Sequence, residues 1–268
     1  MDTQLITSGL GMIVGLILAL TGAGGGILSV PLLVFFLHLP MQAASPIGLL
    51  AVGLASGLGA LIGLYRGIVR YRAAILMGIS GMLAAPFGIL LAQYIPNRPL
   101  LLGFAFILLY NATRTFRQSS PAPLKPDQLA CALKKDDVHL NWTLRCMRKI
   151  AGIGFMSGLL SGLIGVGGGF VIIPSLTRHS QLDIRSIQAT SLAVITLVSV
   201  SGVSAAALHG SLSWPVAIPF ASGSIAGLLV GQMWANKMSP QTIKHLFAGV
   251  SLFAALMMLS KVAGISPV

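Results

Sequence analysis

Charged residues are scarce in this sequence, and their scarcity argues against a soluble fold. Only 8% of the 268 residues are charged and 55% are hydrophobic, whereas a soluble domain carries roughly 25% charged residues. So little charge cannot cover the surface of a soluble protein of this size. We therefore expect an all-α polytopic membrane protein. The 32 glycines agree with this expectation, because glycine is commoner in membrane helices than in soluble ones.

Acidic residues are the scarcest charged type, with five in the whole chain, and none lies within an apolar run. Cation carriers that couple to protons or sodium usually place carboxylates in the membrane, so this absence favours an anionic or neutral solute. The sequence also lacks paired carboxylates, histidines at metal-ligand spacing, a Ser/His/Asp set and a nucleotide-binding loop. We therefore predict that the protein is not an enzyme and has no metal site and no cofactor.

The charge that is present is basic, with a net charge of +12. Lysines and arginines lie between the apolar runs and in one central segment, which is typical of the cytoplasmic loops of membrane proteins. They form no patch interleaved with aromatic residues, so we do not expect nucleic acid as a partner. The expected partners are a small anionic solute and the lipid bilayer, with a homodimer as an open alternative.

Apolar runs follow one another along the chain, and most are near the ~20 residues that cross a membrane as a helix. A polar segment separates the fourth run from the fifth. We predict about eight transmembrane segments in three regions: a first transmembrane repeat at 1–115, a cytoplasmic polar linker at 116–147 and a second transmembrane repeat at 148–268. The runs lie at roughly 5–37, 46–65, 73–95, 99–113, 150–176, 186–208, 214–235 and 243–260.

The two halves are predicted to be homologous repeats. A shift of about 143 residues superimposes them almost without gaps. The motif GAGGG at Gly22–Gly26 then falls on GVGGG at Gly165–Gly169, and Pro31 falls on Pro174. One register holds from end to end, and two similar halves are the usual architecture of secondary transporters.

These glycine-rich motifs interrupt apolar runs near their middle. Each glycine costs a helix about 1 kcal/mol relative to alanine, so the helix should break there, and we expect the following Pro31 and Pro174 to act as hinges. Broken backbone at membrane depth is tolerated where it is buried or lines a cavity. Its N–H groups and the next helix N-terminus can bind an anion. The predicted substrate-binding glycines are Gly22, Gly24, Gly25, Gly26, Gly165, Gly167, Gly168 and Gly169.

A few polar side chains near the span ends are further candidates. Thr190 and Ser191 stand just after a loop and could face the breaks, so we add them to the predicted site. Arg66 and His209 occupy equivalent repeat positions and could draw anions in, although such residues are more often interfacial anchors. The alternative for the glycines is that they only permit close helix crossing.

Two topologies are open. If every run crosses the membrane once, the repeats are parallel. If each glycine break is the tip of a hairpin that returns to its own side, the repeats are inverted. The inverted arrangement leaves only Arg98 and Lys261 on the side opposite the other basic residues, which the positive-inside rule favours. We therefore prefer inverted repeats with both termini outside.

With these motifs, the sequence resembles the TauE/SafE sulfite exporter family. The resemblance rests on Gly-x-Gly-Gly-Gly followed by proline in both halves, and on Thr190-Ser191-Leu192 after the second break. The first half departs from the pattern, with Pro46-Ile47-Gly48-Leu49 where the family often has a threonine–serine pair. The resemblance implies a multi-pass protein, typical of the bacterial inner membrane, that exports sulfur-containing anions such as sulfite, thiosulfate or organosulfonates.

The residues by themselves indicate an anion but do not distinguish sulfite from a carboxylate such as lactate. We therefore expect a secondary transporter that works by alternating access around a central site at the two breaks. The open alternatives are a transporter of other small organic anions, a channel-like pore and a membrane scaffold that transports nothing.

Overall fold

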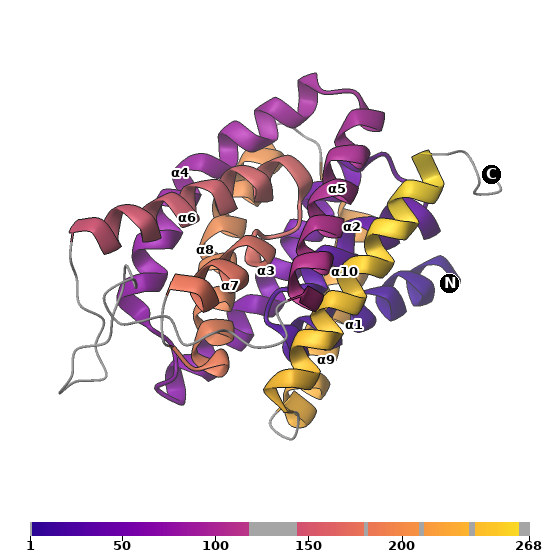
Figure 1. Ribbon diagram of the computed structural model, residues 1–268. Helices are drawn as coiled ribbons and strands as arrows, with labels where there is room; N and C mark the ends of the chain where they lie inside the picture. The colour runs from indigo at the N-terminus through magenta and orange to yellow at the C-terminus, as the bar shows by residue number, and fades with distance from the viewer. Residues whose placement is uncertain (1, 118–143, 180–181, 209–211, 236–238, 263–268) are drawn as a thin grey trace.

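The computed structural model of the protein is a bundle of helices (Figure 1). It describes residues 2–117, 144–179, 182–208, 212–235 and 239–262, and these contain ten helices and no strand. The helices are α1 (Asp2–Thr21), α2 (Gly24–Phe36), α3 (Met41–Tyr65), α4 (Tyr71–Tyr94), α5 (Asn97–Arg117), α6 (Leu144–Ile164), α7 (Gly169–His179), α8 (Ile184–Leu208), α9 (Trp214–Ala235) and α10 (Pro240–Val262).

The prediction of an all-α polytopic membrane protein is confirmed. Seven of the described helices are long and apolar enough to cross a membrane, and α5 has a shorter apolar stretch. The eight predicted runs become ten helices, because the first run divides into α1 and α2 and the fifth into α6 and α7. The assignment of 1–115, 116–147 and 148–268 to two repeats and a cytoplasmic linker stays a prediction, since residues 118–143 lie outside the described residues.

The two halves interlock through their first and fourth helices. The most extensive helix contacts are those of α1 with α9 and of α4 with α6, and the latter pair lies side by side in Figure 1. Glycines make this approach close: Gly15 meets the backbone of Ser224, and Gly158 meets the backbone of Gly81. Without a hydrophobic drive in lipid, small residues allow the backbone contact that holds membrane helices together.

The third helices of the two halves, α3 and α8, run antiparallel. Along α3, Leu49 contacts Gly202, Ser56 hydrogen-bonds Thr196 at 3.1 Å between hydroxyl oxygens, and Gly63 contacts Ala189. The partner number on α8 falls as the number on α3 rises, so equivalent helices point in opposite directions. This is the order of inverted repeats, in agreement with the preference drawn from the basic residues.

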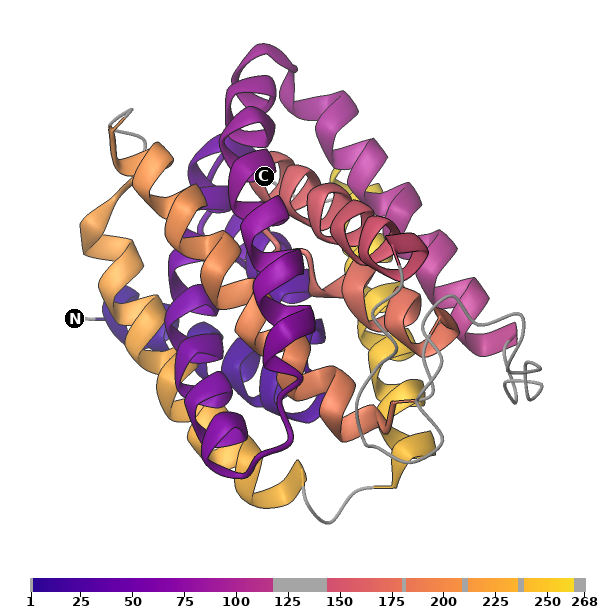
Figure 2. The ribbon, with the colours of Figure 1, turned by 90° about the vertical axis from the view of Figure 1, so that its left-hand side faces the viewer.

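The short helix α2 turns back beside α1 instead of continuing it. Gly25, in its first turn, packs against Val14 and Leu18 of α1. In consequence α3 begins at the same end of the bundle as α1. It ends at the turn that leads to α4, and this turn lies at the bottom of the bundle in Figure 2. The fully buried Ile27 and Phe170 place both short helices in the core.

Candidate functional site

Each glycine-rich break begins with a residue in the left-handed backbone region. Gly22 has φ 74° and Gly165 has φ 82°, and the two residues occupy equivalent positions in the repeat. Their N–H groups donate to Leu18 O at 2.8 Å and to Ser161 O at 2.7 Å, which ends α1 and α6. Gly167 and Gly168 also have positive φ, at 74° and 68°. Only glycine adopts such angles at little cost, so these residues permit the chain to reverse.

The two breaks touch each other at the centre of the bundle. A Cβ atom on Gly26 would strike the carbonyl of Val166, and one on Gly169 would lie 2.6 Å from the Cβ of Ala23. The two contacts are equivalent in the repeat. Gly26 corresponds to Gly169 and Val166 corresponds to Ala23, each by a shift of 143 residues. The first turns of α2 and α7 therefore meet the opposite break.

Helices α3 and α8 each cover the break of the other half. Gln188 of α8 packs against Gly22, and Ser45 of α3 packs against Gly165. These again are equivalent repeat positions. Gln188 also donates from Nε2 to Leu20 O at 3.1 Å. Sequence reasoning missed both side chains, and their equivalence in the repeat is the signal that could have found them.

Hydroxyl groups hold the backbone of the breaks in place. Ser157 donates from Oγ to Gly168 O at 3.0 Å, and Ser29 donates to Gly26 O at 2.7 Å. Gly24 is the first residue of α2, which has no side-chain hydrogen bond at its N-cap, Ala23. Because the first N–H groups of a helix lack intrahelical partners and carry partial positive charge, this helix start is suited to an anion.

Ser191 faces the breaks with its hydroxyl unused. Gln188 contacts Gly22 one turn before it, and Ile195 contacts Gly167 one turn after it, so the 3.6-residue period puts Ser191 on the same face of α8. The residue is fully buried, and its Oγ has no hydrogen-bond partner. A buried hydroxyl without a partner is costly, and a bound solute would satisfy it.

Thr190, next to Ser191, serves the protein scaffold instead. Its Oγ1 donates to Ser186 O at 2.6 Å and accepts from the Arg70 N–H at 3.0 Å, which fixes the turn between α3 and α4. Both hydrogen-bonding functions of the hydroxyl are therefore occupied. The predicted hinges Pro31 and Pro174 lie inside α2 and α7 and not in the breaks themselves.

Thr190→Val is expected to lower stability and leave solute affinity unchanged. Valine keeps the shape but leaves the Arg70 N–H without its partner, which costs about 1–3 kcal/mol when buried. Thermal unfolding in detergent measures the loss. If the transport KM of this variant rises more than twofold, Thr190 contributes to solute binding after all.

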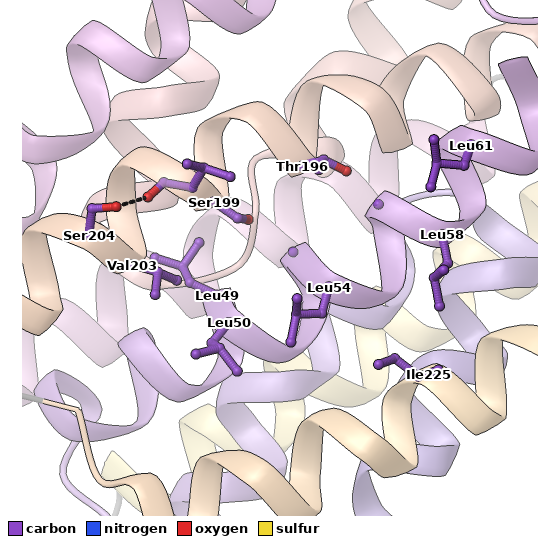
Figure 3. A pocket seen from close by; sticks show the side chains of 13 residues that line it. Leu49, Leu50, Leu54, Leu58, Leu61, Thr196, Ser199, Val203, Ser204 and Ile225 are labelled. Atoms are coloured by element: carbon purple, nitrogen blue, oxygen red, sulfur yellow. Dashed lines mark hydrogen bonds between the residues drawn. The ribbon is translucent and has the colours of Figure 1, made fainter.

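A cavity between α3 and α8 is lined mostly by apolar side chains. It has a volume of about 570 Å³, and leucines dominate its wall (Figure 3). At its rim, Leu54 is 52% exposed and Val200 is 57% exposed, so the cavity opens toward the side of the bundle. Its lining has three hydroxyls and no charged side chain. Thr196 and Ser204 donate to Leu192 O and Val200 O at 2.8 and 2.7 Å, and the buried Ser199 Oγ has no hydrogen-bond partner. Such a wall does not suit a small anion.

Comparison with known proteins agrees with this architecture. The family model described as Sulfite exporter TauE/SafE matches residues 8–258. The chain belongs to the TauE/SafE sulfite exporter family. The polytopic TauE/SafE fold makes it a multi-pass membrane transporter of the cell membrane. Among the described residues no group of three or more His, Cys, Asp or Glu side chains is placed to hold a metal ion.

Curated TauE/SafE relatives are similar along most of their length. A "Probable membrane transporter protein" of Xylella fastidiosa (strain Temecula1) is 28% identical over 251 residues, covering 91% of this chain and 89% of the relative. The "Probable membrane transporter protein YunE" of Bacillus subtilis (strain 168) is 25% identical over 246 residues, covering 87% and 89%. A probable membrane transporter protein of Methanocaldococcus jannaschii is 27% identical over 268 residues, covering 93% and 92%. No solved structure matches the chain.

Proposed function

We propose that the protein is a secondary transporter that exports small sulfur-containing anions, such as sulfite or organosulfonates. The observation that carries this proposal is the contact between the two glycine-rich breaks, where Gly26 meets Val166 and Gly169 meets Ala23. Two helix N-termini converge there, and N–H groups at helix N-termini bind oxyanions. The sulfur specificity draws on the family to which the chain belongs.

Alternating access is the mechanism that inverted repeats favour. Each half makes the same contacts as the other around the breaks, as the pairs Gly22–Gln188 and Gly165–Ser45 illustrate. Exchanging the conformations of two inverted halves exposes the same central site to the opposite side of the membrane. The solute would bind at Gly22, Gly24, Gly25, Gly26, Gly165, Gly167, Gly168, Gly169 and Ser191, which surround the contact.

The test is transport by the purified protein in liposomes. Uptake of labelled sulfite would be measured with and without a pH gradient, with unlabelled sulfoacetate, thiosulfate, sulfate and lactate as competitors. Saturable uptake with counterflow, blocked by sulfonates, is expected. Block by lactate alone would identify a carboxylate carrier, unsaturable flux would identify a pore, and no flux with any anion would leave a scaffold.

Ser191→Ala is expected to raise the KM for sulfite about tenfold, because the buried hydroxyl would lose its hydrogen bond to the anion. Stability should be unchanged or higher, since Ser191 Oγ has no partner within the protein. Side-by-side transport and thermal unfolding separate this outcome from that of Thr190→Val. An unchanged KM would remove Ser191 from the site.

A further inference from the structure

A small pocket with four polar side chains opens at the end of the bundle where α3 ends and α8 begins. Its volume is about 80 Å³, and none of the described residues that line it is acidic. Its polar side chains are two arginines and two glutamines: Arg66, Arg185, Gln188 and Gln232. They come from three helix ends, α3, α8 and α9, which belong to both halves of the protein.

This pocket adjoins the first glycine break. Gln188 lines the pocket and at the same time packs against Gly22. Ala19, three residues before the break, also lines the pocket. Gln188 thus contacts both the pocket and the first break, so an anion in the pocket would lie near the backbone that we propose binds it.

The rim of the pocket is positively charged. Arg66 and Arg185 are exposed, and a third arginine, Arg70, belongs to the same turn, with a buried Nε that has no hydrogen-bond partner. The nearby acidic residue Asp183 is exposed and accepts the Arg185 main-chain N–H at 3.2 Å. Clefts lined by one sign of charge raise the local concentration of counter-ions, and guanidinium groups match the oxygens of oxyanions.

The positions equivalent to the polar residues of the pocket carry different side chains in the other half. A shift of 143 residues converts Arg185 to Gln42, and Gln232 to the buried Ile89. Gln188 likewise becomes Ser45. The counterpart of Arg66 is His209, which lies outside the described residues. The contacts at the breaks are therefore equivalent in the two halves, whereas the four polar residues of the pocket have counterparts of a different type.

The structure assigns this pocket, defined by Arg66, Arg185, Gln188 and Gln232, as an anion-capture vestibule that makes the transporter bind its oxyanion more tightly from this end than from the other. This inference rests on the proposed function. The basic residues gathered at this end predict, by the positive-inside rule, that it faces the cytoplasm. Capture there would load the central site from the cytoplasmic pool.

The test compares the two membrane faces in the double variant Arg66→Gln/Arg185→Gln. The KM for labelled sulfite would be measured in inside-out and right-side-out membrane vesicles. In the natural protein the KM should be lower from the cytoplasmic face. The double variant should raise this KM about tenfold, the low end of electrostatic focusing in clefts, and change the KM from the other face less than twofold. Raising inert salt on the cytoplasmic side should reproduce part of the loss through screening.

Matched controls separate vestibule charge from general effects. Arg98→Gln removes one arginine charge, against two in the double variant, from an exposed position at the other end of the bundle and should leave the cytoplasmic KM unchanged. The lysine pair Arg66→Lys/Arg185→Lys should restore at least part of the affinity. Equal KM values from both faces, or an effect of the double variant confined to the opposite face, would overturn the vestibule while the transporter assignment stands.

A protein that transports none of the sulfur-containing anions would overturn the proposed function, and the vestibule would then be decided by binding. Labelled sulfite would be bound to the detergent-solubilised protein and to the double variant at equal monodispersity. Weaker binding of sulfite to the double variant than to the natural protein would support the vestibule even if the protein does not transport sulfite. Equal binding, or no binding to either protein, overturns it.

Discussion

Gly168→Val and Gly25→Val are each expected to abolish sulfite transport while the protein remains in the membrane. Gly168 has φ 68°, an angle that a β-branched residue adopts only with strain, and its added Cβ would strike Ser157. On Gly25 the added atoms would strike the backbone of Val14 and push α2 away from α1. A misplacement of about 1 Å in a positioned site can cost about 100-fold.

Gly67 supplies the control for backbone strain. Its φ is 68°, the same as that of Gly168, but no atom lies within 4 Å of its added Cβ. Gly67→Ala and Gly168→Ala therefore carry similar strain at the backbone, and only the latter disturbs a break. Transport rates should be divided by the amount of monodisperse protein recovered from the membrane. Normal transport by both valine variants would mean that the breaks do not bind the solute.

The second large effect is expected where the two halves interlock. In Gly15→Leu the new side chain would clash with the backbone of Ser224 in α9. In Gly158→Leu it would clash with the backbone of Gly81 in α4. Overpacking costs about 1–3 kcal/mol or more, and here the obstacle is backbone, which cannot rotate away. Each variant should lose at least roughly 5 °C in melting temperature in detergent.

The repeat supplies matched controls on the same helices. Gly9 in α1 and Gly152 in α6 are exposed, with no atom within 4 Å of an added Cβ. Gly9→Leu and Gly152→Leu should therefore leave the melting temperature within experimental error of the unmodified protein. If Gly158→Leu and Gly152→Leu melt at the same temperature, the close contact between α4 and α6 is absent from the native protein.

Much of the fold could be predicted from the sequence because its causes are local. Three adjacent glycines disfavour helix wherever they occur, so the positions of the breaks at Gly22–Gly26 and Gly165–Gly169 required no tertiary information. The apolar runs predicted membrane helices for the same reason. The pairing of α1 with α9 and of α4 with α6, in contrast, depends on contacts between distant segments.

The candidate site was predicted only in part, and Thr190 and Ser191 show why. Adjacent residues of a helix point about 100° apart. Here that rotation turns Thr190 toward Arg70 and Ser191 toward the breaks. Nothing in the two residue types decides which hydroxyl is used by the scaffold and which is left without a partner. Ser45 and Gln188 were missed because each acts on the break of the other half.

The sequence by itself determined the membrane class and the points at which the helices break, because apolar length and glycine strain are properties of short segments. Only the tertiary structure decided that α3 and α8 run antiparallel, that the breaks touch, and that Arg66 and Arg185 line one pocket. These features join residues more than 100 positions apart, and their contacts exist only once the helices have packed.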